Sequence, residues 1–151
     1  MVLLTLLSRG SFARYDVEDC LVYRVVSKSL ERIADHATTI ARMSASIESP
    51  LPPRLIDEIS KASDLTISVL EDALKSLAKA DGTLANKSIA SAESVEREAE
   101  SVMDKLFNFK LSQKLIVAVR LALESLKRIS EHSEDVAEMA INLTARRTEL
   151  Y

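Results

Sequence analysis

Apolar side chains recur every three or four residues along most of the chain, which is the spacing of one face of an α-helix. The pattern breaks at Pro50 to Pro53, at Gly82 and around Asn108 to Ser112, where residues that interrupt helices gather. We therefore expect four long helices, over residues 16–48, 53–81, 83–109 and 112–147.

The expected helix ends carry the residues that favour them. Asp16 is the predicted N-cap of the first helix, Pro53 opens the second, and Gly82 is predicted to end it as the residue after the C-cap. Within the helices the apolar positions form a single stripe. In the first helix it consists of Val26, Leu30, Ile33, Ala37, Ile40, Ser44 and Ile47.

Long helices with one apolar stripe each, joined by short loops, bury those stripes best as an antiparallel bundle. The predicted fold class is therefore all-α, a bundle of four long helices forming one domain over residues 16–151. Many stripe positions are Ala or Ser, which bury little apolar area, so stability is expected to gain from oligomerisation. Residues 1–15 are interpreted as a stub of another domain or as a contact to one.

Composition narrows the classes of function. Two Gly and three Pro in 151 residues argue against a β-sandwich or barrel. A formal charge of -3 and few aromatics argue against direct binding of nucleic acid. A single cysteine, Cys20, and apolar runs too short to span a bilayer favour a cytoplasmic protein that meets membranes only through its partners.

The first and fourth predicted helices share an internal repeat at an offset of 96 residues. Ser29-Leu-Glu-Arg-Ile-Ala-Asp-His-Ala37 aligns with Ser125-Leu-Lys-Arg-Ile-Ser-Glu-His-Ser133. The match includes Arg and His positions that helix packing alone does not dictate, so we interpret it as a true repeat.

The string Leu30-Glu-Arg-Ile-Ala-Asp-His-Ala37 resembles the signature of the PhoU family of phosphate-uptake regulators, and Glu100 to Asp104 is similar to that family's acidic motif. The resemblance covers about residues 16–147. It implies spectrin-like three-helix bundles, two in a full-length member with six helices. With four helices this chain looks like an archaeal-like short form: one complete bundle preceded by the last helix of another.

Two pairs of carboxylates stand four residues apart, Glu31 with Asp35 and Glu100 with Asp104, so each pair projects from one helix face within reach of a single cation. From spacing alone, solvated faces of amphipathic helices are the favoured interpretation of both pairs. The PhoU resemblance implies metal (Fe, Mn, Zn or Mg) at Glu31, Asp35, Glu100, Asp104 and Glu131. Lys127, which stands where Glu31 stands in the first repeat, puts the second site in doubt.

His36 and His132 occupy equivalent repeat positions and read as half-buried packing residues rather than ligands. No Gly-rich phosphate loop, nucleophile elbow or paired cysteines are present, so an enzyme is not expected. The resemblance implies a regulator of phosphate uptake that acts by protein contact, with transporter components or a sensor kinase as partners and with a homodimer as the expected assembly. The alternative is a metal-free structural dimerisation module of a transport (phosphate or potassium) or DNA-binding protein.

Overall fold

The computed structural model describes residues 17–149, with side chains described for residues 20–145. Its helices are α2 (Val17–Ala45), α3 (Pro53–Lys79), α4 (Gly82–Lys105) and α5 (Gln113–Glu149), with a 3₁₀ turn, η2 (Leu106–Asn108), after α4. The described residues contain no strand, which confirms the all-α fold class. Segment 1–15 and the expected N-cap Asp16 lie outside the described residues.

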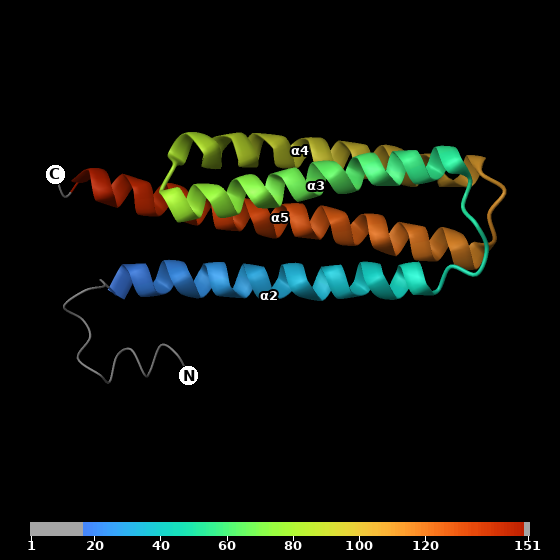
Figure 1. Ribbon diagram of the computed structural model, residues 1–151, viewed down its shortest axis with the longest axis horizontal. Helices are drawn as coiled ribbons and strands as arrows, with labels where there is room; N and C mark the ends of the chain where they lie inside the picture. Colours follow the sequence, from blue (N-terminus) through green and yellow to red (C-terminus); the bar gives the residue numbers. More distant parts are fainter. Residues whose placement is uncertain (1–16, 150–151) are drawn as a thin grey trace.

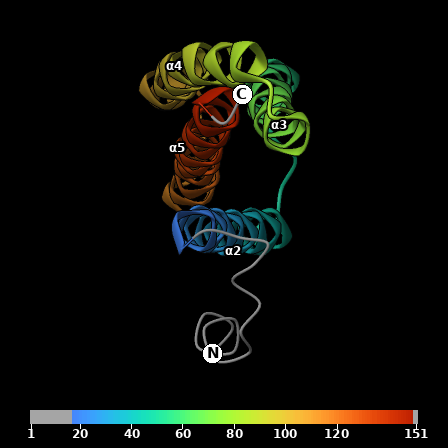
Figure 2. The ribbon, with the colours of Figure 1, turned by 90° about the vertical axis from the view of Figure 1, so that its left-hand side faces the viewer.

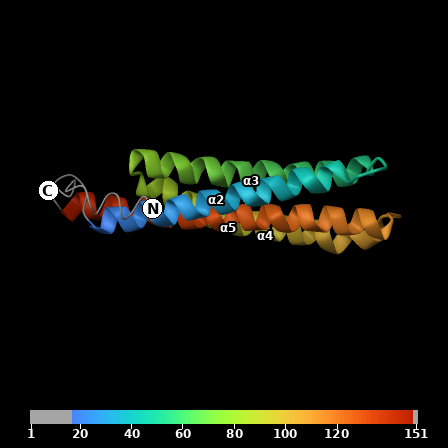
Figure 3. The ribbon, with the colours of Figure 1, turned by 90° about the horizontal axis from the view of Figure 1, so that it is seen from below.

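Successive helices run antiparallel, and α5 lies between α2 on one side and the α3–α4 pair on the other (Figure 1). Helices α3, α4 and α5 make a three-helix bundle, whereas α2 packs on the opposite side of α5 and makes few contacts with the other two (Figure 2). Seen from the α2 side, α2 runs lengthwise along the molecule with no described helix over it (Figure 3). The molecule is therefore a three-helix bundle with a fourth helix attached through α5.

Because α5 lies between α2 and the α3–α4 pair, it is buried on two sides. Val119, Leu126 and Val136 belong to the predicted stripe, and Leu123 and Ala137 are buried as well. The prediction of one apolar stripe per helix is therefore wrong for α5. A central helix needs a wider buried surface than a peripheral one, because two layers pack against it.

The turn between α3 and α4 differs from its predicted form. Ala80, with a φ of 51°, is the left-handed residue that ends α3, and the Asp81 N–H donates to the Ser76 carbonyl at 2.9 Å. Asp81 then caps α4, because its side chain accepts a hydrogen bond from the Leu84 N–H at 3.0 Å. Gly82 is consequently the first residue of α4 rather than the residue that ends α3.

None of the described helices contains a stretch long and apolar enough to cross a lipid bilayer.

Candidate functional site

The first acidic pair lies on the outer surface of α2. Glu31 and Asp35 are both exposed, and each has a basic neighbour on its own helix. Lys28 Nζ lies 2.9 Å from Glu31 Oε2, and Arg32 lies 3.7 Å from Asp35. The hydrogen bond from Lys28 and its charge lower the pKa of Glu31. The pair therefore offers two exposed carboxylates on one helix.

The second acidic region is organised around a lysine. Lys127 on α5 is only 12% exposed, and its ammonium lies 2.7 Å from Glu100 and 3.4 Å from Glu96, both on α4. The hydrogen bond to Glu100 raises the pKa of Lys127, while burial acts in the opposite direction. Since this ammonium already occupies the space beside Glu100, the second acidic region does not fit a metal ion between α4 and α5.

The remaining predicted metal residues stand apart. Asp104 is exposed on α4, and Glu131 pairs with Arg128 on its own helix at 2.7 Å. Within residues 20–145, no three His, Cys, Asp or Glu side chains come together in an arrangement that could hold a metal ion. A metal at any of the predicted residues would thus need further ligands from outside the described side chains.

The two repeat histidines meet at the interface of α2 and α5. The His36 and His132 rings are stacked, with centroids 6.0 Å apart and an angle of 27° between their planes. His132 Nδ1 and the Ser29 hydroxyl each lie 3.2 Å from the same Asp135 oxygen. Burial lowers the pKa of His36, and the charges of His132 and Arg128 lower it further. The repeat shows that the two histidines are equivalent, but the sequence pattern did not predict that their rings meet.

A small acidic hollow lies between α4 and α5, with a volume of about 60 Å³. We call it the α4–α5 hollow. It is lined by Ala92, Glu93 and Glu96 on α4 and by Lys127, Ser130, Glu131 and Glu134 on α5. Burial raises the pKa of Glu134, and the neighbouring carboxylates of Glu138, Asp135, Glu131 and Glu93 raise it further. The sequence signalled the acidity of this part of α4 but not the hollow.

Part of the predicted α2 stripe is uncovered. Leu30 is 39% exposed, and Ala37 and Ser44 are exposed as well, whereas Val26 and Ile33 of the same stripe are buried. Val22 and Ser29, outside the predicted stripe, complete the buried side of α2. The repeat shows how unusual this is. The counterparts on α5 are buried: Leu126, the equivalent of Leu30, is 7% exposed, and Val119 is 2% exposed where its equivalent Tyr23 is 48% exposed.

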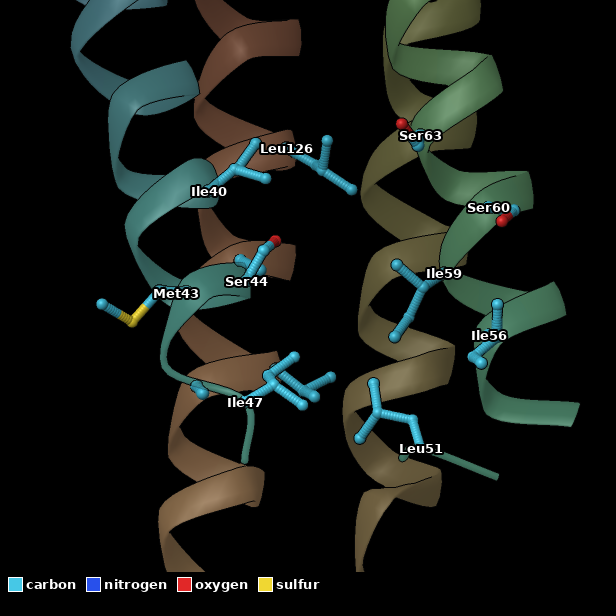
Figure 4. Close-up of a pocket in the computed structure, with 13 residues that line it drawn as sticks. Ile40, Met43, Ser44, Ile47, Leu51, Ile56, Ile59, Ser60, Ser63 and Leu126 are labelled. Carbon is cyan, nitrogen blue, oxygen red and sulfur yellow. The ribbon is translucent and has the colours of Figure 1, made fainter. Parts of the chain in front are cut away.

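An apolar groove of about 190 Å³ continues this uncovered face between α2 and α3. In Figure 4, Ile40, Ser44 and Ile47 point across the gap toward Leu51 and Ile59, whereas Met43 points away. Other lining residues are Ile56, Ser60 and Ser63 on the α3 side and Ala118, Val119, Ala122 and Leu126 on α5. A groove with such walls is the kind of surface that an amphipathic helix covers.

The fold defines an all-helical bundle domain. Residues 59–140 match the PhoU domain, so the chain belongs to the PhoU family.

Two curated relatives are similar over most of the chain. The chain is 32% identical over 126 residues to the phosphate-specific transport system accessory protein PhoU homolog of Pseudomonas putida, covering 78% of this chain and 49% of that protein. The homolog of the same description from Pseudomonas aeruginosa is 29% identical over 126 residues, covering 78% of this chain and 52% of that protein. The chain thus spans about half the length of these relatives. No solved structure gives a significant match.

Proposed function

We propose that the chain acts as an accessory regulator of phosphate transport through protein contact, on the cytoplasmic side of a transport system. The observation that carries this proposal is the match of residues 59–140 to the PhoU domain, together with two relatives described as accessory proteins of phosphate-specific transport. Components of the transporter or a sensor kinase are the partners that such a role requires.

Protein contact is supported by the surface of α2. One exposed side of α2 carries Tyr23, Ser27, Leu30, Ala34, Ala37, Ala41 and Ser44, without a charged residue among them. Small side chains in such a stripe let a second helix approach closely. A surface of this kind stays exposed only until a partner covers it.

The proposal includes metal at the first acidic pair only. Glu31 and Asp35 supply two carboxylates from one exposed helix face, whereas a hard cation takes about six oxygen ligands. The element that covers α2 would supply the rest. Lys127 removes the second acidic region from this part of the proposal.

Phosphate uptake by cells that lack the chain tests the proposed function. We expect deletion of the coding sequence to raise uptake of labelled phosphate in phosphate-rich medium, because the regulator restrains the transporter. Complementation with the intact chain should restore the lower rate. Unchanged uptake after deletion, in rich and in depleted medium, would contradict the proposed role.

A second candidate function is a metal-free structural dimerisation module. The uncovered α2 stripe favours it, since a second copy would bury Leu30 and Tyr23 as the rest of the bundle buries Leu126 and Val119. The two candidates differ in whether deletion alters phosphate uptake.

A further inference from the structure

The α4–α5 hollow contains one buried hydroxyl group that lacks a hydrogen-bond partner among the described residues. Ser130 is 3% exposed, and its hydroxyl oxygen is buried without a hydrogen-bond partner among the described residues. Ser125 and Ser133 on the same helix instead donate to the carbonyl four residues earlier, at 2.9 and 2.7 Å. A buried hydroxyl without a partner is costly, so its presence beside a hollow indicates a ligand that donates to it.

The charge of the hollow indicates a cation. Each nearby base is already engaged: Lys127 with Glu96 and Glu100, Arg97 with Glu93 at 3.3 Å, and Arg128 with Glu131 at 2.7 Å. Glu134 makes no ion pair with a base of the described residues, and besides burial the neighbouring carboxylates of Glu138, Asp135, Glu131 and Glu93 raise its pKa. A cation in the hollow would neutralise Glu134 and satisfy Ser130 together.

The volume of the hollow and the positions of its polar groups favour a guanidinium group over a bare metal ion. The hollow of about 60 Å³ has room for about four water-sized atoms. A guanidinium group has four heavy atoms and five N–H donors in a planar fork, so it reaches acceptors that are set apart from one another. A metal ion needs its ligands around one point, and no three acidic or histidine side chains of residues 20–145 are so arranged.

We propose that the α4–α5 hollow binds the guanidinium group of an arginine carried by a basic segment of a protein partner, with Ser130 and Glu134 as its acceptors. The proposal stands on the hollow alone, and it holds equally for a partner outside phosphate transport. It also places this contact on the face of the bundle formed by α4 and α5, away from the groove between α2 and α3.

Titration of the full chain with the peptide acetyl-Gly-Arg-Gly-amide, followed by NMR, tests the proposal. We expect saturable shifts at the amides of Ala92, Ser130 and Glu134, with a dissociation constant of about 1 mM, as suits one side chain. The same peptide with citrulline in place of arginine should give no saturable shift, because citrulline is neutral. The lysine peptide should bind about fivefold more weakly, because an ammonium lacks the planar fork.

Two variants isolate the hollow from the general acidity of the surface. Glu134→Gln should weaken binding of the arginine peptide about fivefold or more. Glu71→Gln removes the same charge from an exposed position on α3 and should leave the affinity unchanged. Ser130→Ala removes the buried acceptor without adding volume, so it should fold normally and bind more weakly.

Several outcomes would overturn the proposal. They are equal affinity for arginine and lysine peptides, equal affinity of the Glu134→Gln variant and the parent, and shifts spread evenly over the acidic faces. Saturation of the same three amides by Mg²⁺ at lower concentrations than by the peptide would assign the hollow to a metal ion instead.

Discussion

Lys127 lies on α5 at the repeat position that Glu31 occupies on α2, and the structure shows what this exchange does. Its ammonium lies between two carboxylates of α4, where it neutralises an acidic stripe that is otherwise unfavourable. Glu31 makes no such interhelical contact with the described side chains and is exposed beside Lys28. One repeat position therefore serves as an internal cation on α5 and as an exposed acid on α2.

Replacing Lys127 by glutamate tests this assignment. We expect Lys127→Glu to lower the free energy of unfolding by about 1–2 kcal/mol in the presence of a chelator, because it adds a third carboxylate in a partly buried place. Added Mn²⁺ should restore part of that loss by binding the new carboxylate group. Thermal melts of Lys127→Glu, with Lys127→Gln and the parent as controls, measure both effects, and a metal response in Lys127→Gln would contradict the explanation.

His36 gives the α2–α5 interface a dependence on pH. Since burial and nearby positive charge lower its pKa in the folded state, the unfolded chain binds more protons as the pH falls below about 6.5. Stability is therefore lost as the pH drops from the unfolded pKa to the lower folded pKa. The groups that act on His36 are His132, Arg128 and Arg32, which oppose its protonation, and Asp35, which favours it.

Melting temperatures measured between pH 7.5 and 5 should fall more steeply for the parent than for His36→Gln. The raised pKa of Glu134 acts in the opposite direction, because a folded-state pKa above the unfolded value favours folding at low pH. The comparison of parent and variant at each pH removes that contribution, since both proteins retain Glu134. Parallel pH profiles for the two proteins would show that His36 does not contribute.

At the scale of the element, the α3–α4 turn shows how far the sequence predicts where one helix ends and the next begins. The sequence offers Gly82 as the obvious terminator, yet the left-handed position falls two residues earlier, at Ala80. The Asp81 side chain accounts for this, because it caps α4 and so fixes where the next helix begins. Asp81 as the cap of α4 and Gly82 as the end of α3 exclude each other, and the sequence pattern alone does not show which of the two forms.

Ala80→Gly should stabilise the protein by about 1 kcal/mol, because glycine adopts the left-handed conformation without the steric cost that alanine carries. Ala78→Gly, two residues earlier on the exposed side of α3, is the matched control and should destabilise by about 1 kcal/mol. Chemical denaturation of the two variants gives both values. If the two substitutions had the same sign, the assignment of the turn would be wrong.

At the scale of the whole molecule, the apolar periodicity predicted the helices and the bundle but not the number of neighbours of each helix. The stripes of α2 and α5 are nearly the same in sequence, yet Leu30 is exposed where Leu126 is buried. Periodicity reports which face is apolar, whereas burial depends on which other helices are present. For the same reason the sequence predicts that Glu31 and Asp35 share one helix face, but it does not show whether other ligands face them.

An uncovered stripe on α2 predicts a dimer of this chain. We expect sedimentation velocity to show the parent as a dimer and Leu30→Glu as a monomer, because a charge in the middle of the apolar stripe prevents its burial. Phe107→Glu changes an even more exposed side chain, on η2 at the end of the bundle, and should remain dimeric. A parent that is monomeric at all concentrations would refute the dimer.

The attachment of α2 mainly through α5 has a consequence for how the molecule opens. Separation of α2 from α5 exposes one interface and leaves the contacts among α3, α4 and α5 in place, so α2 forms a cooperative unit of its own with a lower opening free energy than the bundle. Amide hydrogens of α2 will accordingly exchange with solvent faster than those of α4. A partner that binds α2 will slow its exchange selectively, which makes hydrogen exchange a direct readout of where that partner binds.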